Sequence, residues 1–547
     1  MAVRAMTPRV RSGLVIAAVI GVGVAFALAY GDTFGAKNQQ TYFLDVLVRA
    51  FPDLYRNDWF VTQNHHYHVV FAWLMAPLYA IDPDGPVVFG IAQIVTMVAM
   101  FGAIYSLIAA VTERSRLAIF IGIVGLLVLG GGRALGGSYL YSDYLQPSSF
   151  ATLGWLVAMN LWIRDRVLLA GIALALGAAF HLNYALLGIG MFAMAELAAR
   201  RFDWRRIALL VGPSLVVVAC FLPTMIHASR STHDAHALDL LVRFIFPNHF
   251  KPSRVRLELL ALVGWHLIAL ALRPDGDDRP AVRLFWFGTV VMGTCILVTS
   301  LVQIPPLLTF TRLFVWRVAP LGILVAQLLL FSHIRAFARG DQPRPHGWQL
   351  ACLVVGAGLI IVNAFSRPRG IYPEVITIVF AAAAVTIAVR REWLATVMCA
   401  VLCVYPLWTE RAHLTSPILF MTGEASVTRW ARTSTPRDAV FLTPPYAGEF
   451  RLLARRAVIV DDKSPPMYLD ELIAWHQRLS ASVGARSAAS LQDVWHRWDT
   501  LSGDELVAIA NSFHADYVVL DKSRSTATLP APIAFEDPYN IVYAIAH

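Results

Sequence analysis

The chain has 547 residues, of which 57% are hydrophobic and 15% charged, and its mean hydropathy is +0.59. A soluble domain usually carries about 25% charged residues, so this composition excludes an ordinary soluble protein and predicts a multi-pass membrane protein. The formal charge of +9 does not indicate nucleic-acid binding, because basic residues beside membrane helices normally record topology.

The first apolar segment, Gly13–Tyr30, is just long enough to cross a bilayer, which takes about 20 residues. Its basic flank is similar to that of a signal peptide, but no small-residue cleavage site follows, so we expect a retained helix. Length and hydropathy predict about thirteen spans in a polytopic α-helical protein: Gly13–Tyr30, Pro86–Val111, Leu117–Gly131, Ser148–Ile163, Val167–Phe180, Leu182–Ala199, Ile207–His227, Leu257–Leu272, Leu284–Gln303, Leu313–Ile334, Trp348–Phe365, Ile371–Val389 and Trp393–Trp408.

A long first loop, residues 31–85, follows the first span, and its stretch Gly31–His68 is polar and aromatic. Val69–Ile81 is apolar but too short to cross, so we expect an interfacial helix within the loop. If this segment does not cross and the N-terminus is cytoplasmic, nearly every dense Lys/Arg cluster lies inside, as the positive-inside rule requires. The first loop, the loops Gly132–Pro147 and Ala228–Arg256, and the C-terminus then lie outside.

The composition becomes that of a soluble domain from about Gly423. We therefore divide the chain into a transmembrane domain, residues 1–422, and a small extracytoplasmic α/β domain, residues 423–547. Short apolar runs predict strands and amphipathic runs predict helices: strands at Ala439–Leu442, Ala457–Val460, Tyr517–Leu520 and Ile541–Ile545, and helices at Tyr468–Leu479, Ala488–Trp498 and Asp504–Ser512.

Two acids stand out in the outside loops. Asp32 lies within two residues of the end of the first span, where a carboxylate can act as general base or bind a hard divalent cation. Asp143 lies in the next outside loop, just before Pro147, a residue favoured in the first turn of a helix. The two carboxylates could meet at one site, although each is also typical of a helix cap or a solvated turn.

Histidines form a second set of candidates. His65 and His68 have a spacing that can bind a transition metal, but histidine-rich turns at an interface are also common. His181 and Asn183 lie between two short spans. Polar residues within a membrane often mark a site or pathway, and a tight turn between two half-length helices is the alternative.

The outside loop Ser229–Arg256 is basic on the side where the positive-inside rule predicts few cations. Recognition of phosphate is one reason, because Arg offers a bidentate fork and Lys a point charge. Contact with lipid headgroups is the alternative. The candidate phosphate-binding residues are Arg243, His249, Lys251, Arg254 and Arg256 in this loop, with Arg312 and Arg317 at the outer end of a later span.

This layout resembles the GT-C glycosyltransferases, integral-membrane enzymes that take a sugar from a polyprenyl-phosphate carrier. It is most similar to the catalytic subunits of bacterial and archaeal oligosaccharyltransferases. Their C-terminal domain often opens with a tryptophan helix, a TP-x-DA turn and a strand, and Trp430–Pro445 followed by Phe450–Asp462 is similar. The resemblance covers the whole chain in topology but only short stretches in motif.

The resemblance implies sugar transfer from a lipid-linked donor at the outer face of the cytoplasmic membrane. It assigns Asp32 to acceptor activation or metal binding and Asp143 to metal or acceptor contact. It also implies Mg²⁺ or Mn²⁺ as a possible cofactor. The second loop has one acid where the family often has a pair, and no WWD-type motif is present, so the acceptor is left open. A transporter or flippase of a lipid-linked or anionic substrate, and a non-catalytic assembly factor, are the alternatives.

Overall fold

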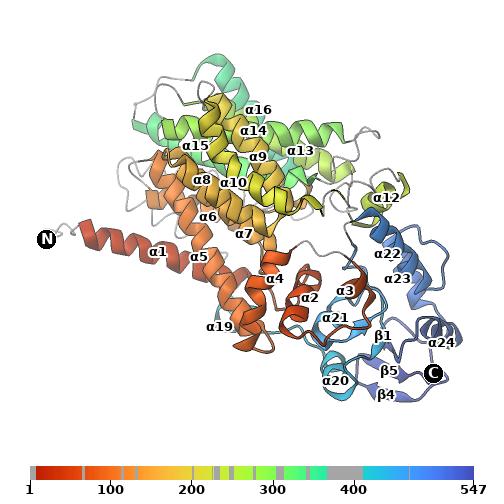
Figure 1. Cartoon of the computed structure of the whole chain (residues 1–547). Helices are drawn as coiled ribbons and strands as arrows, with labels where there is room; N and C mark the ends of the chain where they lie inside the picture. Colours follow the sequence, from red (N-terminus) through yellow and green to blue (C-terminus); the bar gives the residue numbers. More distant parts are fainter. Residues whose placement is uncertain are drawn as a thin grey trace.

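The computed structural model describes residues 8–546, apart from 65–67, 113–115, 130–133, 200–202, 224–225, 227–234, 246–251, 275–278, 303–312, 340–344, 366–410 and 467. Figure 1 shows two parts: a bundle of helices, and an α/β domain drawn in blue. The helices of the first loop lie between them. The bundle consists of α1 (Pro8–Tyr30), α5 (Pro86–Val111), α6 (Arg116–Leu129), α7 (Pro147–Ile163), α8 (Val167–Phe180), α9 (Leu182–Ala199), α10 (Trp204–Cys220), α13 (Pro252–Ala271), α14 (Arg279–Leu301), α15 (Ala319–Arg339) and α16 (Gly347–Phe365).

Five helical segments of the described chain are long and apolar enough to cross a membrane. Several others are shorter apolar helices or carry polar residues, so the total of about thirteen spans stays a prediction. The last two predicted spans, residues 371–389 and 393–408, lie outside the described residues. The five long segments are Ser12–Tyr30, Pro86–Val111, Leu182–Ala199, Pro280–Leu301 and Val315–Ile334.

Small residues bring neighbouring helices of the bundle close together. A Cβ placed on Gly154 of α7 would lie 2.6 Å from Gly177 Cα of α8, and one on Gly171 of α8 would lie 2.3 Å from the Leu209 carbonyl oxygen of α10. Apolar lipid gives little hydrophobic drive for helix association, so close van der Waals packing of this kind stabilises membrane bundles.

One end of the bundle carries a network of charged side chains. Arg206 Nε is 2.7 Å from Glu196 Oε1, and Arg206 and Arg283 each lie 2.9 Å from a carboxylate oxygen of Asp165. These residues come from segments that the sequence predicts on the cytoplasmic side or close to it. The structure groups them at one end, while the assignment of that end to the cytoplasm stays a prediction.

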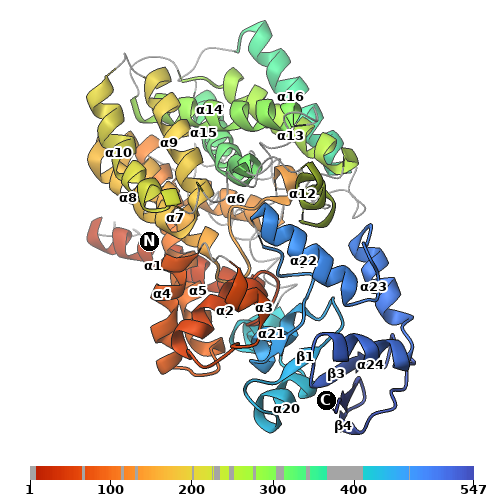
Figure 2. The same ribbon diagram turned by 45° about the vertical axis from the view of Figure 1, so that its right-hand side comes forward.

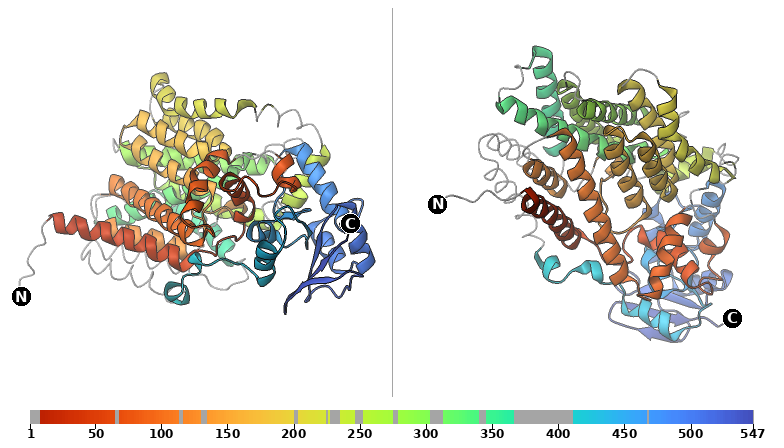
Figure 3. Two further views of the ribbon diagram at one scale, coloured as in Figure 1. Left: turned by 60° about the horizontal axis from the view of Figure 1, so that its bottom comes forward. Right: turned by 60° about the vertical axis from the view of Figure 1, so that its left-hand side comes forward.

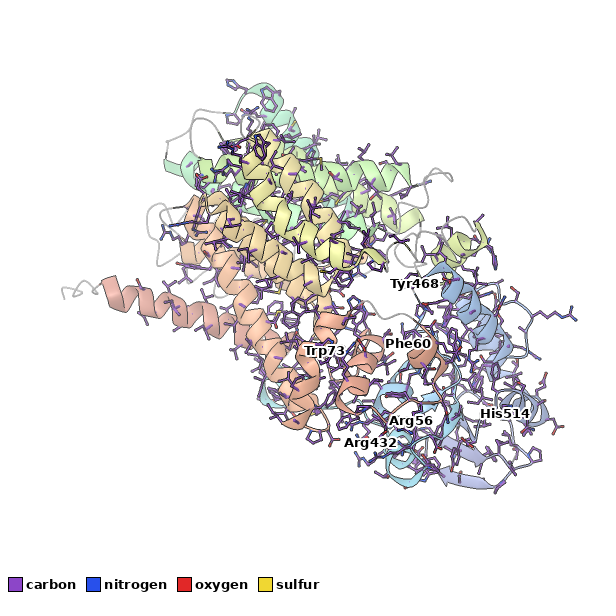
Figure 4. All side chains as sticks on the ribbon, viewed as in Figure 1. Arg56, Phe60, Trp73, Arg432, Tyr468 and His514 are labelled. Carbon is purple, nitrogen blue, oxygen red and sulfur yellow. The ribbon has the colours of Figure 1, made fainter. Side chains whose placement is uncertain are left out.

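The first loop forms the short helices α2 (Gln39–Ala50), α3 (Trp59–Gln63) and α4 (Val69–Met75), followed by the 3-10 turn η1 (Ala76–Ala80). Phe71 and Ala72 of α4 are fully buried against α2, whereas Trp73 and Leu74 are 65% and 51% exposed. Figure 4 labels Trp73 on this helix. A short helix with one exposed apolar face suits an interfacial position, and that position stays a prediction.

The C-terminal domain contains a five-stranded sheet in the order β2-β1-β3-β5-β4. β2, β1 and β3 run parallel, and β5 and β4 add antiparallel strands. The strands are β1 (Val440–Leu442), β2 (Ala457–Val458), β3 (Tyr517–Asp521), β4 (Ile533–Glu536) and β5 (Asn540–Ala544), and the helices are α20 (Ser426–Ser434), α21 (Gly448–Ala454), α22 (Leu469–Ala481), α23 (Leu491–Asp499) and α24 (Gly503–Ser512). The predicted small α/β domain is thus present. The apolar and amphipathic runs did not predict β4 and α21, while α20 contains Trp430 and corresponds to the tryptophan helix that the resemblance implies.

The first loop is docked on the C-terminal domain, as the views in Figures 2 and 3 also show. Arg451 of α21 donates from Nε to Asp58 Oδ2 at 2.8 Å, and its Nη1 lies 2.5 Å from Asp461 Oδ2. All three side chains are at most 1% exposed. Phe60, labelled in Figure 4, lies under the same guanidinium, 5.4 Å from ring centroid to Arg451 Cζ. The loop and the domain therefore lie on the same side of the bundle.

Candidate active site

Asp32 and Asp143 meet where the first span ends. The backbone N–H of Asp32 donates to the backbone carbonyl of Asp143 at 2.7 Å. Between their side chains lies Lys37, whose Nζ is 3.1 Å from Asp32 Oδ2 and also contacts Asp143 Oδ2. The two acids that the sequence places in separate loops thus share one ammonium group, and we call this arrangement the acid pair.

The turn after α1 determines this geometry. Gly35 has φ +90° and Lys37 has φ +53°, both in the left-handed region, so the chain reverses sharply before α2. The Asp32 carboxylate accepts a hydrogen bond from the Thr33 N–H at 2.8 Å, and Gln39 Oε1 accepts one from the Gly35 N–H at 2.9 Å. The turn aims Lys37 back across the end of α1, towards the loop that carries Asp143.

Lys37 is held on a third side by an aromatic ring. Its Nζ lies 5.7 Å from the ring centroid of Tyr144, within the range of a cation–π contact. Burial lowers the pKa of Lys37, but the carboxylates of Asp143 and Asp32 outweigh it and raise the pKa above its usual value. Lys37 therefore stays charged. One signal in the sequence could have identified it, namely a lysine five positions after Asp32.

The acid pair is a poor fit for the metal ion that the sequence suggested. Among the described residues, no group of three or more His, Cys, Asp or Glu side chains could hold a metal. The pair offers two carboxylates, but the ammonium of Lys37 contacts an oxygen of each. At 4 Å and an effective dielectric constant of 20, each unit of added positive charge meets a repulsion of about 4 kcal/mol. A divalent metal ion therefore does not fit between these two carboxylates while Lys37 is in place.

A second polar cluster surrounds Arg317, in the 3-10 turn η5 (Val315–Val318) at the start of α15. Arg317 Nη1 lies 2.7 Å from His181 Nε2. Because an arginine can only donate, Nε2 accepts and the neutral imidazole carries its proton on Nδ1. His181 is 8% exposed, and its Nδ1 has no hydrogen-bond partner among the residues that the structure describes. A buried N–H donor is thus left open beside a fixed positive charge.

Tyrosine hydroxyls add further donors to this cluster. The Tyr42 side chain lies close enough to Arg317 to interact with its guanidinium. The Tyr184 hydroxyl accepts from Thr152 at 3.3 Å, and the Tyr139 hydroxyl accepts from Gln146 Nε2 at 2.8 Å. A hydroxyl that accepts still has its own proton to donate. One guanidinium with several neutral donors is the chemistry of an anion-binding site, and we call this group the Arg317 cluster.

The acid pair and the Arg317 cluster are contiguous. The Tyr144 ring faces Lys37, and its hydroxyl lies 3.5 Å from the hydroxyl of Tyr139, which is close enough to Arg317 to interact electrostatically with it. The predicted histidine His68 also joins: its ring centroid is 5.1 Å from that of His181, and its Nδ1 is 3.1 Å from the Phe180 carbonyl. That nitrogen is engaged by the backbone, and His65 lies outside the described residues.

The other predicted phosphate-binding residues are placed differently or not described. Arg243, in the π-helical segment η3 (Leu241–Ile245), forms an exposed ion pair with Asp239 at 2.8 Å. Arg256 is exposed on α13. His249, Lys251 and Arg312 lie outside the described residues, as does the side chain of Arg254. Of the predicted cations that the structure describes in detail, Arg317 is the one beside the acid pair. Tyr42, Tyr139 and Tyr184 were not predicted as site residues from the sequence.

Comparison with known families gives one short match. A family described as a domain of unknown function, DUF6798, matches residues 423–482. This segment contains α21 and Asp461, so it covers the part of the C-terminal domain that binds the first loop. No curated protein matches the chain.

Among solved structures, one similar chain is described as the crystal structure of ArnT from Cupriavidus metallidurans bound to undecaprenyl phosphate. The match covers 98% of this chain and 98% of that one, at 13% sequence identity and a TM-score of 0.48.

Proposed function

We propose that this chain is a membrane glycosyltransferase that moves a sugar from a polyprenyl-phosphate carrier to an acceptor at the outer face of the cytoplasmic membrane. The observation that carries the proposal is the contact between the acid pair and the Arg317 cluster through Tyr144 and Tyr139. Transfer from a phosphate carrier needs a carboxylate for the incoming nucleophile and donors for the departing anion, and the two groups supply these parts.

Asp32 serves the acceptor. Its carboxylate is held by the Thr33 N–H and by Lys37, and its side chain is 27% exposed. An acceptor hydroxyl hydrogen-bonded to it attacks the anomeric carbon of the sugar, and its proton passes to the carboxylate. Asp143 holds Lys37 and, through its backbone carbonyl, the turn that carries Asp32.

The Arg317 cluster serves the leaving group. As the new glycosidic bond forms, the bond between the anomeric carbon and the phosphate oxygen breaks, and the lipid phosphate leaves with the electron pair. Arg317, the Nδ1–H of His181 and the tyrosine hydroxyls are placed to stabilise the charge that develops on this oxygen. Preorganised donors of this kind usually contribute more than acid–base chemistry when the leaving group already departs readily.

Sugar transfer in membrane vesicles tests the proposal. Vesicles with the wild type, Asp32→Asn or Asp53→Asn are supplied with radiolabelled polyprenyl-phosphate sugars, and label in acceptor products is counted at equal protein levels. We expect Asp32→Asn to lose transfer by about 100-fold or more, the usual contribution of a positioned carboxylate. Asp53 lies in the same loop in an exposed ion pair, with 63% side-chain exposure, so Asp53→Asn should retain the wild-type rate.

Two outcomes would contradict the proposal. Equal transfer by the wild type and Asp32→Asn would remove Asp32 from catalysis. Movement of the labelled lipid across the vesicle membrane, with no covalent product, would identify the chain as a transporter instead. Two other results would support the assigned roles. Asp32→Asn would lose transfer but still bind the donor, as expected if Asp32 serves the acceptor. Arg317→Gln would bind the donor more weakly, as expected if the Arg317 cluster serves the leaving group.

A further inference from the structure

The acid pair contains its own cation. Lys37 Nζ touches one carboxylate oxygen of Asp32 and one of Asp143, and the Tyr144 ring covers a third direction at 5.7 Å. A small cation placed between two carboxylates would occupy the same position. Two carboxylates from adjacent loops are otherwise the kind of oxygen donors that hard divalent cations prefer.

The chain fixes this arrangement through its backbone. The Asp32 N–H is bonded to the Asp143 carbonyl at 2.7 Å, which joins the two loops independently of the lysine side chain. Lys37 has a left-handed φ of +53°, a conformation that lysine seldom adopts. The carboxylates would therefore stay near each other without the ammonium, and the ammonium is placed by a turn rather than by chance contact of a flexible side chain.

We propose that Lys37 is a built-in cation that takes the place of a divalent metal ion between Asp32 and Asp143. The wild-type chain then binds no divalent cation at this site, and removal of the ammonium creates a site for one. Lys37 is a positioning residue, since it holds the two carboxylates in place and balances their charge. The role assigned to the carboxylates rests on the proposed transferase activity, whereas the exchange of lysine for metal does not.

Binding of Mn²⁺ to the purified full-length chain in detergent tests this inference without any assay of transfer. Free Mn²⁺ is measured by electron paramagnetic resonance during titration of the wild type, Lys37→Met, Lys37→Arg and the double variant Lys37→Met with Asp143→Asn. Methionine keeps most of the length of lysine but lacks its charge. We expect Lys37→Met to bind about one Mn²⁺ per chain at least tenfold more tightly than the wild type, Lys37→Arg or the double variant.

Three results would overturn the inference. Wild-type binding of Mn²⁺ that is lost in Asp32→Asn would show that metal and lysine coexist. Equal, weak binding by Lys37→Met and the wild type, in a monodisperse Lys37→Met sample with an unchanged circular dichroism spectrum, would show that the acids do not form a metal site. Equal binding by Lys37→Met and the double variant would place the ion elsewhere. If Lys37→Met aggregates, Lys37→Gln is titrated in its place under the same criteria.

The same variants separate this inference from the proposed activity. If the chain is a transferase and the inference holds, chelation with EDTA leaves wild-type transfer unchanged. A chain that transfers no sugar at all but shows the expected Mn²⁺ pattern would contradict the proposed function and leave the exchange of lysine for metal intact.

Discussion

We expect Asp462 to contribute to a pH dependence of the stability of the C-terminal domain. Asp462 is 9% exposed and accepts a hydrogen bond from Trp495 Nε1 at 3.0 Å. Burial, aided by Asp461 and Glu449 and opposed by Lys463 and the bond from Trp495, raises the pKa of Asp462 to about 6 from an ordinary value of 3.8. The folded domain therefore binds this proton more tightly than the unfolded chain does.

The sign of the pH effect follows from that difference. Between pH 4 and pH 6 the folded state holds more protons, so the free energy of unfolding falls as pH rises, by about 3 kcal/mol in all. Asp462→Asn keeps an acceptor for Trp495 without the charge. We expect it to raise the thermal midpoint of the detergent-solubilised chain at pH 7.5 and to leave it near the wild-type value at pH 4. Tryptophan fluorescence reports the transition.

The control for this effect is an exposed acid of the same domain. Asp438 is exposed just before β1, and Asp438→Asn should change the midpoint little at either pH. An Asp462→Asn midpoint that stays below the wild-type midpoint at pH 7.5 would show that the charged form of Asp462 is favoured by the fold.

At the scale of elements, the turn between α1 and α2 depends on Gly35. A Cβ on this residue would lie 2.9 Å from Leu453 Cδ2 of α21, and its φ is +90°. We expect Gly35→Ala to destabilise the protein by about 1–2 kcal/mol from backbone conformation alone, and to reduce sugar transfer because the turn carries Asp32 and Lys37. Thermal unfolding and the vesicle assay measure the two effects.

Gly102→Ala is the matched control, since a Cβ at Gly102 within α5 would meet no atom of the described part of the chain within 4 Å. Alanine is also favoured over glycine in a helix by up to about 1 kcal/mol, so this variant should be as stable as the wild type or more so. If Gly35→Ala behaved like Gly102→Ala, the turn would tolerate a side chain and would not determine the position of the acid pair.

Site residues were easiest to predict from the sequence where a charged residue lies beside the end of a helix. Asp32 and Asp143 were found because each lies beside a helix end in an outside loop, and the structure does bring them together. Lys37 was missed because its role depends on two left-handed residues and on a contact across 106 positions of the chain. Neither feature produces a periodic pattern.

Elements were missed for similar physical reasons. β4 exposes 54% of Ile533 and has no buried face of its own, so it lacks the alternation that marks a strand. α21 is seven residues long, too short for a helical period to stand out. The strands β1, β2, β3 and β5 were predicted because buried apolar runs lie between turn residues.

At the scale of the whole molecule, the buried ion pairs of Arg451 hold the first loop on the C-terminal domain. Asp58→Ala would leave the guanidinium with one of its two carboxylates, and breaking a buried pair from one side typically costs about 3–5 kcal/mol. We expect this variant to expose the first loop, so that limited proteolysis cleaves within residues 31–85 much faster than in the wild type.

Asp53→Ala supplies the comparison within the same loop. Its partner Arg56 is 69% exposed, and exposed pairs contribute at most about 1 kcal/mol. Cleavage of Asp53→Ala should therefore follow the wild-type time course. If Asp58→Ala resisted protease as well as Asp53→Ala does, contacts other than the ion pair would hold the loop on the domain.

The buried ion pair between Asp58 and Arg451 also has a consequence for biosynthesis. Asp58 and Arg451 are separated by 393 positions, so at about 5 to 20 residues per second a ribosome needs roughly 20 to 80 s to supply the guanidinium after the carboxylate. During that interval the first loop has already left the ribosome, and its partner surface has not been made. A product truncated before residue 451 would keep that loop unpaired permanently, which gives the cell's membrane proteases a means to distinguish an unfinished chain from a complete one.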